Sequence, residues 1–167
     1  YLQAPSFTGI HGTQARTVSM WMKTEARDAA LLSWGSSGGG QKWTFRTQST
    51  NGVSGALRTE VSGGHVVGST LVADGNWHHV VAVLPRGSNN VSQVLLYVDG
   101  FLETISSTDT SSINTSNSSA VKIGSDFSAR HFQGLIDEVA IFDRALNGFE
   151  IEALSLTTPA NGTFDYE

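Results

Sequence analysis

The side chains of this sequence best suited to bind or transform a ligand are four polar residues between positions 46 and 65. Arg58 and Glu60 are two residues apart, so on a strand they share one face. Arg46 lies in the preceding strand-like segment, and His65 opens the following one. If these segments pair in sequence order, all four side chains gather on one face of a sheet.

Such a cluster has two interpretations. It can be a set of ion pairs on an exposed sheet face, each contributing about 0–1 kcal/mol to stability. It can instead be a groove for sugar hydroxyls, carboxylates or sulfates, because the planar guanidinium of arginine donates two parallel hydrogen bonds to such groups. The sequence leaves both interpretations open.

Tryptophan is the second residue type that often contacts sugars, because its large ring combines an apolar face with a polar edge. Of the four tryptophans, Trp34 and Trp43 flank the glycine-rich loop 35–40 and are expected near a rim of the fold. We take Trp43 as the candidate platform for a sugar ring. The alternative is that Trp43 belongs to the core, where large aromatic residues are usually buried.

The histidines and aspartates are the candidate metal ligands of this sequence. His78 and His79 are adjacent, so on a strand they point to opposite faces, which argues against a shared zinc ion. Asp137 lies among apolar neighbours and needs either an ion-pair partner or a cation. Arg144 is the partner in the first case. In the second, Asp137 binds calcium, and Asp126 contributes a further oxygen.

The elements that must position these residues are short strands separated by Gly, Asn, Asp and Ser. Residues 17–24 alternate between apolar and polar, as in a half-buried strand, whereas residues 76–84 are apolar on both faces, as in a central strand. Asp99-Gly100 between two apolar runs predicts a tight hairpin. Further strands are expected at 29–34, 42–47, 56–61, 65–72, 93–98, 120–124 and 134–142, a mobile exposed loop at 106–119, and a short helix within 147–156.

This pattern predicts one all-β domain, an antiparallel β-sandwich. Short strands with turns every 8–12 residues and almost no helix are typical of that class. An up-and-down barrel is the alternative, and it would show cleaner alternation than residues 76–84 do. A chain of 167 residues has room for one hydrophobic core, not two.

Composition excludes several function classes. The formal net charge is -5, which argues against a protein that neutralises nucleic-acid phosphates. The chain has no cysteine, so disulfides, thiolate zinc sites and a cysteine nucleophile are excluded. No apolar run approaches the roughly 18 residues of a membrane span. The hydrophobic share of 39% is enough for a packed core.

Four segments in a fixed order resemble a known family. They are RTVSMWMKT at 16–24, DGNWHHVVAVL at 74–84, VLLYVDGFLE at 94–103 and FQGLIDEVAIFDRAL at 132–146, followed by a short helix at 148–154. Together they resemble the laminin G-like branch of the concanavalin A-like lectin/glucanase superfamily, over most of residues 1–156. The resemblance implies a jelly roll of two curved sheets, with a glycan on the concave sheet or its rim and, in many members, a calcium ion near the rim. A Phe-Asp-Gly segment that usually precedes the part matched by residues 1–5 is absent.

The resemblance also raises the question of catalysis. Laminarinase-type glycosidases of this superfamily carry the pattern Glu-x-Asp-x-x-Glu, but around Asp137 the corresponding positions hold Leu135 and Ala140. Alginate-lyase-type enzymes carry an Arg-x-Glu strand, which Arg58-Thr59-Glu60 matches, but their companion strands are absent. We therefore expect no enzymatic activity, with polysaccharide degradation as the less favoured alternative.

The sequence thus predicts a laminin G-like domain over residues 1–156, with a tail or linker at 157–167. The expected function is a non-catalytic carbohydrate-binding module of a larger secreted or cell-surface protein, with a polysaccharide and neighbouring domains as partners. The alternative is a structural or adhesion module. The expected ligand-binding residues are Trp43, Arg46, Arg58, Glu60 and His65, and the expected calcium ligands are Asp137 and Asp126.

Overall fold

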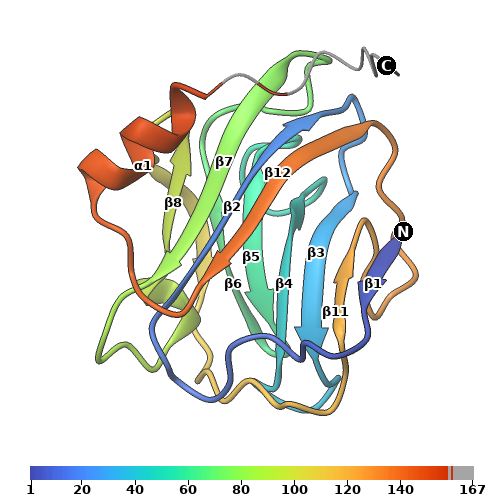
Figure 1. Ribbon diagram of the computed structural model, residues 1–167, viewed down its shortest axis with the longest axis vertical. Helices are drawn as coiled ribbons and strands as arrows, with labels where there is room; N and C mark the ends of the chain where they lie inside the picture. Colours follow the sequence, from blue (N-terminus) through green and yellow to red (C-terminus); the bar gives the residue numbers. More distant parts are fainter. Residues whose placement is uncertain (158, 160–167) are drawn as a thin grey trace, which may run out of the picture.

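Two antiparallel sheets packed face to face form the fold, as Figure 1 shows for the computed structural model. The structure describes residues 1–157 and residue 159. One sheet has seven strands and the other five. The predicted all-β sandwich is confirmed, and so is its single short helix.

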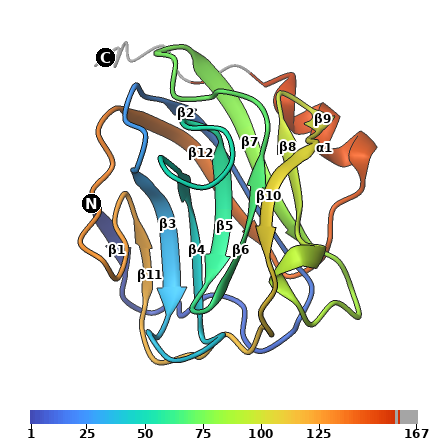
Figure 2. The same ribbon diagram turned by 180° about the vertical axis from the view of Figure 1, so that it is seen from behind.

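The seven-stranded sheet carries the residues of the candidate site. Its consecutive strands β3 to β6 pair in sequence order, which is the condition for residues 46–65 to gather on one face. Figure 2 shows this sheet in front. In spatial order its strands are β1 (Leu2–Ala4), β11 (Val121–Ile123), β3 (Ala30–Gly35), β4 (Lys42–Thr47), β5 (Leu57–Val61), β6 (Gly64–Gly68) and β10 (Ile105–Asp109).

The five-stranded sheet is centred on β7, the strand expected to be covered on both faces. In spatial order its strands are β12 (Leu135–Phe142), β2 (Arg16–Lys23), β7 (Trp77–Leu84), β8 (Leu95–Val98) and β9 (Phe101–Leu102). A 3-10 helix, η1 (Val91–Gln93), precedes β8. The helix α1 (Gly148–Ser155) covers the outer face of the sheet, where Ile151 and Leu146 pack with Val81 and Val83.

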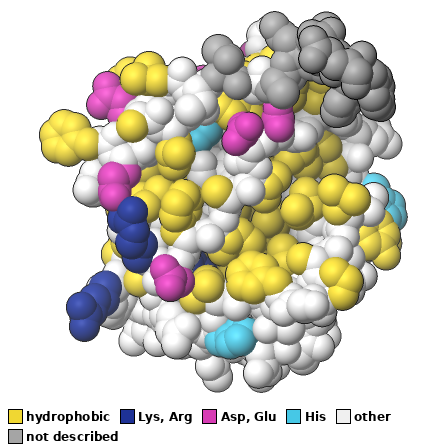
Figure 3. Space-filling model, viewed as in Figure 1, with side chains coloured by type: hydrophobic (Ala, Val, Ile, Leu, Met, Phe, Trp, Pro, Cys, Tyr) yellow, Lys and Arg dark blue, Asp and Glu magenta, His cyan; other side chains and the backbone are white. Residues whose placement is uncertain are grey.

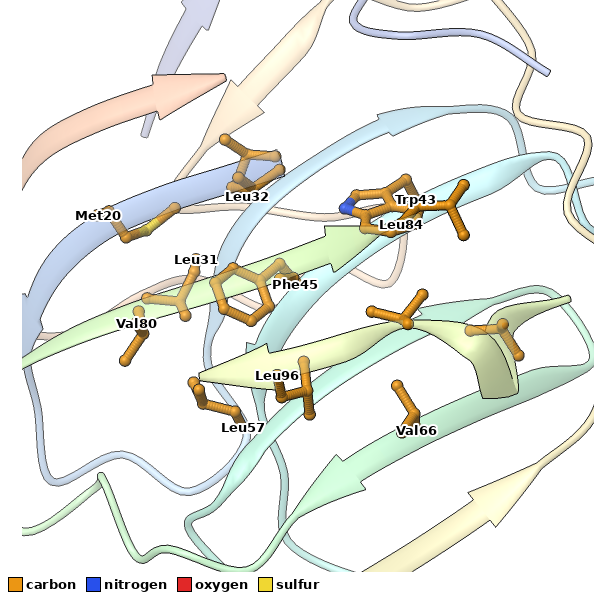
Figure 4. Close-up of a cluster of buried hydrophobic side chains, with 14 of the residues drawn as sticks. Met20, Leu31, Leu32, Trp43, Phe45, Leu57, Val66, Val80, Leu84 and Leu96 are labelled. Atoms are coloured by element: carbon orange, nitrogen blue, oxygen red, sulfur yellow. The ribbon is translucent and has the colours of Figure 1, made fainter. Parts of the chain in front are cut away.

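The core lies between the sheets and takes alternate side chains of the inner strands, such as β2, β4 and β7. Met20, Val80 and Leu96 come from the five-stranded sheet and are fully buried. Figure 4 shows them opposite Phe45 and Leu57 of the seven-stranded sheet. On β4 and β5 the inward positions hold Trp43, Phe45, Leu57 and Val61, and the alternating outward positions carry the charged residues.

The prediction of a loop over residues 106–119 is wrong for its first part, because the segment up to residue 109 is a strand. Residues 105–109 form β10, which pairs with β6 and makes one edge of the seven-stranded sheet. Ile113 is buried in the core, and its backbone N–H donates to the carbonyl of Asn89 at 2.8 Å. Low sequence complexity does not indicate a loop here. An edge strand is held by backbone hydrogen bonds to its neighbour, and the buried side chain of Ile113 fixes the segment that follows it.

The C-terminal tail predicted at 157–167 lies outside the described residues, apart from Thr157 and Pro159. The Thr157 hydroxyl accepts a hydrogen bond from the indole N–H of Trp21 at 3.3 Å. Within the described part of the chain, no helix has the length and apolar character needed to cross a membrane.

Candidate functional site

The candidate site lies on the outward face of the seven-stranded sheet. Strand register places Arg46 opposite Arg58 on the neighbouring strand, and Glu60 opposite His65 on the next one. The structure therefore brings together the four polar residues singled out from the sequence. Lys42, four residues before Arg46 on β4, lies on the same outward face.

Glu60 is the centre of this cluster, and four cations surround its carboxylate. Oε1 accepts hydrogen bonds from Lys42 Nζ at 2.7 Å and from Arg130 at 3.0 Å. Oε2 accepts two hydrogen bonds from Arg46, at 3.1 and 2.9 Å, and lies 2.6 Å from Arg58 Nε. Only 4% of Glu60 is exposed, so the charged groups of the cluster compensate one another away from bulk water.

The four cations differ in their other partners. Arg46 also binds Asp28 at 2.7 Å, and Arg130 also binds Asp126 at 2.6 Å. Among the described residues, Glu60 is the only carboxylate with which Lys42 and Arg58 form ion pairs. Arg58 Nε is buried and lies 2.6 Å from Glu60 Oε2, so this part of the guanidinium is taken up by the ion pair. The two terminal nitrogens of the Arg58 guanidinium form no hydrogen bond among the described residues, so they remain for another acceptor.

The cations fix the charge states in the cluster. Burial by itself would raise the pKa of the Glu60 carboxyl, but the cations Arg46, Lys42 and Arg58 outweigh burial and hold this pKa well below its usual range. Burial, followed by the nearby Arg58, lowers the pKa of the His65 imidazole, so His65 is neutral at pH 7. Its Nε2 lies 3.3 Å from the Ser107 hydroxyl on β10. Glu60 is therefore a fixed negative charge and His65 a neutral polar group.

A hollow of about 350 Å³ opens over β5 and β6 beside this cluster. The loop 48–56 overhangs the sheet (Figure 2): a side chain at Gly52, whose φ is +74°, would collide with the Ser106 hydroxyl on the outward side of β10. The hollow is lined by Lys42, Asn51, Arg58, Glu60, the turn 61–64, His65 and Asp109.

The outward face is closed on the other side of the hollow by the loop 124–134. The Ser33 hydroxyl on β3 donates to the carbonyl of Ser125 at 2.9 Å, and Arg130 of the same loop reaches over to Glu60. Thr44, between them on β4, is fully buried. The accessible polar surface is therefore a hollow over the β5–β6 hairpin, not a groove that crosses the whole sheet.

Trp43 does not belong to this surface, which corrects the expectation of a stacking platform. The ring of Trp43 is fully buried, stacks on Trp34 at 5.8 Å between centroids, and lies 5.1 Å from the guanidinium carbon of Arg16. Its neighbours at positions 42 and 44 face outward, so position 43 faces the core. Arg16, itself buried, donates to the backbone carbonyls of Ile10 and Gly12 and ties the N-terminal segment to the core.

The two expected calcium ligands have different surroundings. Asp126 is buried in a turn, where its carboxylate accepts hydrogen bonds from the backbone of Ser128 and from Arg130. Asp137 lies on β12 next to a bulge, and Arg144, its expected partner, pairs with Glu150 at 2.7 Å. Among the described residues, no group of three or more His, Asp or Glu side chains is suited to hold a metal ion. Calcium binding stays a prediction.

The adjacent histidines point to opposite faces of β7, as expected. His79 is buried under the outer face of the five-stranded sheet, with Nε2 2.8 Å from the Ser19 hydroxyl. His78 contacts Asp99 at 2.8 Å and Asp74 at 3.2 Å. Their environments also move their pKa values apart, since the hydrogen bond to Asp99 raises that of His78 and burial lowers that of His79 to about 4.

Sequence reasoning missed Lys42 and Arg130 as members of the cluster. The alternation of residues 42–46 places Lys42 on the same face as Arg46, and this pattern is a signal that could have identified it. Arg130 pairs with Asp126 four residues before it, but nothing in the sequence indicates that it reaches Glu60, 70 positions away. Only the course of the loop over the sheet brings Arg130 there.

Comparisons with known proteins agree with this architecture. A laminin G-like family model, described as the concanavalin A-like lectin/glucanases superfamily, matches residues 1–152. Domain 4 of AbnA, a GH43 extracellular arabinanase from Geobacillus stearothermophilus solved in complex with arabinotriose, superposes with a TM-score of 0.68 and 20% identity. That alignment covers 92% of this chain and 71% of the AbnA chain.

Two further solved structures share the fold at lower identity. A heptameric SAP-like pentraxin from Limulus polyphemus has a TM-score of 0.56 and 16% identity, over 89% of this chain and 73% of the pentraxin. Domains LG4-5 of the mouse laminin alpha1 chain give 0.55 and 15%, over 87% of this chain and 43% of theirs. None of the curated proteins compared with the chain matches it. The chain belongs to the laminin G-like part of the concanavalin A-like lectin/glucanases superfamily.

Proposed function

We propose that this domain is a non-catalytic carbohydrate-binding module that holds a saccharide in the hollow over β5 and β6. The observation that carries the proposal is the convergence of Lys42, Arg58, Glu60 and His65 on one accessible hollow. A saccharide needs several hydrogen-bond donors and acceptors fixed close together, and this cluster offers both kinds. Because the cluster sits on paired strands, its groups are held in place before any ligand arrives.

The relatives support a saccharide as the ligand. AbnA domain 4 covers most of this chain in the superposition and was solved with arabinotriose bound. A family described by lectins and glucanases is one in which sugar recognition recurs. In the same proposal, the domain works outside the cell, as part of a larger secreted or cell-surface protein, with neighbouring domains as further partners.

The surroundings of Glu60 support binding in place of catalysis. A glycosidase of the retaining type needs two carboxylates about 5 Å apart, one of which must be protonated to act as an acid. In this cluster the cations keep Glu60 ionised. The neighbouring carboxylates of Asp28 and Asp126 are paired with Arg46 and Arg130. These groups are arranged to hold charge in place, not to transfer a proton.

A second candidate function, a structural or adhesion module, is favoured by exposed apolar side chains. Figure 3 shows hydrophobic side chains gathered on the face that Figure 1 presents. Phe149 on α1 is 87% exposed, Leu156 just after it 79%, and Phe101 on β9 78%. Large apolar side chains in contact with water are more frequent where another protein or domain binds.

A glycan array separates the two candidates. The domain, with calcium and with a chelator, should bind at least one class of saccharide. Absence of binding to every glycan under both conditions would contradict the proposed function and leave the adhesion module. Incubation with laminarin, alginate, agar and carrageenan should release no reducing ends and no unsaturated products. Product that disappears in Glu60→Gln would show instead that Glu60 is catalytic.

A further inference from the structure

We propose that the hollow selects saccharides bearing a carboxylate or a sulfate group, and that Arg58 and Lys42 bind this anionic group. The inference rests on the proposed function and adds the chemical class of its ligand. It follows from the unequal way in which the four cations around Glu60 are neutralised.

Arg46 and Arg130 each pair with a second carboxylate besides Glu60. Arg46 donates to both Glu60 and Asp28, and also to the backbone carbonyl of Thr47 at 2.9 Å. Arg130 donates to Asp126 and Glu60, and lies 3.6 Å from Asp28. Neither residue lines the hollow. These two guanidiniums therefore hold the cluster together and are not presented to a ligand.

Arg58 and Lys42, in contrast, are accessible to a ligand, because both line the hollow. Their one acidic contact in the described structure is Glu60, a single negative charge that Arg46 and Arg130 share as well. Arg58 Nε is paired with Glu60 Oε2 at 2.6 Å, whereas the two terminal nitrogens of its guanidinium form no hydrogen bond within the described structure. A guanidinium with unused donors at the wall of a hollow is a binding site for an acceptor oxygen, and an anionic oxygen gives the shortest and strongest such bonds.

The other groups at the hollow are compatible with this assignment. His65 has a lowered pKa and is a neutral neighbour at pH 7. Asp109 is the second carboxylate of the lining, and it lies on the exposed edge strand β10, on the far side of His65 from Glu60. His65 thus lies between Asp109 and the part of the hollow next to Arg58 and Lys42. With a neutral sugar in the hollow, Arg58 and Lys42 would have only the carboxylate of Glu60 as their shared counter-charge.

Binding of the wild-type domain to matched polysaccharides tests the inference without any variant. The probes are alginate, which carries carboxylates, carrageenan, which carries sulfates, and carboxyl-reduced alginate, which is neutral. We expect the domain to bind alginate or carrageenan at least tenfold more tightly than the neutral polymer, with affinity that falls as salt rises. The alginate and carrageenan arms distinguish the two possible anions.

The variants locate the effect. Arg58→Gln should weaken binding to the preferred anionic polymer by about tenfold or more, which corresponds to about 1.4 kcal/mol. Arg58→Lys should recover part of it, because it keeps the charge without the planar fork. Arg86→Gln, which removes an exposed arginine outside the hollow, is the matched control and should change nothing. Thermal unfolding of each variant establishes that it is folded.

Equal affinity for alginate, carrageenan and carboxyl-reduced alginate, with no loss in Arg58→Gln, would overturn the inference but leave the proposed function intact. An anionic preference that Arg58→Gln leaves unchanged would overturn the assignment to this hollow. If the domain binds no saccharide of either kind, the proposed function itself fails.

Discussion

Replacement of Glu60 by glutamine tests the charge cluster most severely, because one carboxylate compensates four cations. Glutamine keeps the size of the side chain but removes the charge that Lys42, Arg46, Arg58 and Arg130 contact at 2.6 to 3.0 Å. Removal of one partner from a buried ion pair costs about 3–5 kcal/mol. For a domain of this size, each kcal/mol lowers the melting temperature by roughly 2–4 °C, so Tm should fall by about 10 °C.

Urea unfolding at pH 7 measures the free energy of unfolding, with Glu152→Gln on the exposed side of α1 as the matched control. The double variant Glu60→Gln/Arg58→Gln should regain part of the loss, because it removes one of the uncompensated cations. If Glu60→Gln and Glu152→Gln unfold within about 0.5 kcal/mol of each other, which is the usual range for surface substitutions, the cluster is only a set of surface ion pairs.

The same variant has a pH signature. The pKa of Glu60 is lowered in the folded state, so its ionised form stabilises the fold at all pH values above its unfolded pKa of about 4.3. This contribution disappears as pH falls below that value toward the lowered pKa of the folded state. The stability difference between wild type and Glu60→Gln should therefore be constant from pH 5 to 7 and shrink below pH 4. A difference independent of pH would contradict the assignment.

Three further predictions follow from the rest of the structure. Trp43→Phe should lower the free energy of unfolding by about 1–3 kcal/mol without changing saccharide affinity, because Trp43 is buried in the core. If a folded Trp43→Phe variant lost affinity, Trp43 would be a stacking platform for the sugar after all. NMR titration should give His79 a pKa of about 4 and His78 a pKa above 6.5, and the reverse order would contradict their environments. Because the pKa of His79 is lowered, its burial destabilises the fold as pH falls below 6.5. Because the pKa of His78 is raised, its contribution to stability is lost as pH rises through that pKa. Calcium at about a hundredfold excess over its Kd should add about 2.7 kcal/mol and raise Tm by several degrees, and Asp137→Ala should abolish the rise; equal midpoints with calcium and chelator would refute the calcium site.

The strand framework could be predicted because alternation and turn residues are local signals. The segment 42–47 was predicted with the bounds that β4 has in the structure, and the central position of β7 followed from a run that is apolar on both faces. The polar cluster followed from the same logic, since pairing of β4, β5 and β6 in sequence order sets Arg46, Arg58 and Glu60 side by side.

The parts that failed depend on contacts between distant segments. β10 has almost no apolar residues and becomes a strand because β6 offers an unpaired edge. Arg130 joins the cluster only because its loop folds over β3 and β4. The expectation for Trp43 was wrong for a different reason. It relied on the closeness of Trp43 to the glycine-rich loop, although the alternation of the strand places Trp43 on the same, core-facing side as Phe45.

If the hollow over β5 and β6 holds the saccharide, a bulky side chain placed in the hollow should block binding. Asn51 is exposed, lines the hollow from the overhanging loop, and forms no side-chain hydrogen bond in the described structure, so Asn51→Trp should fill the space without disturbing the fold. Asn117→Trp, on an exposed segment outside the hollow, is the control. On a glycan array, Asn51→Trp should lose the signals of the wild-type domain, and Asn117→Trp should keep them. Retention of those signals by a folded Asn51→Trp would contradict saccharide binding in the hollow.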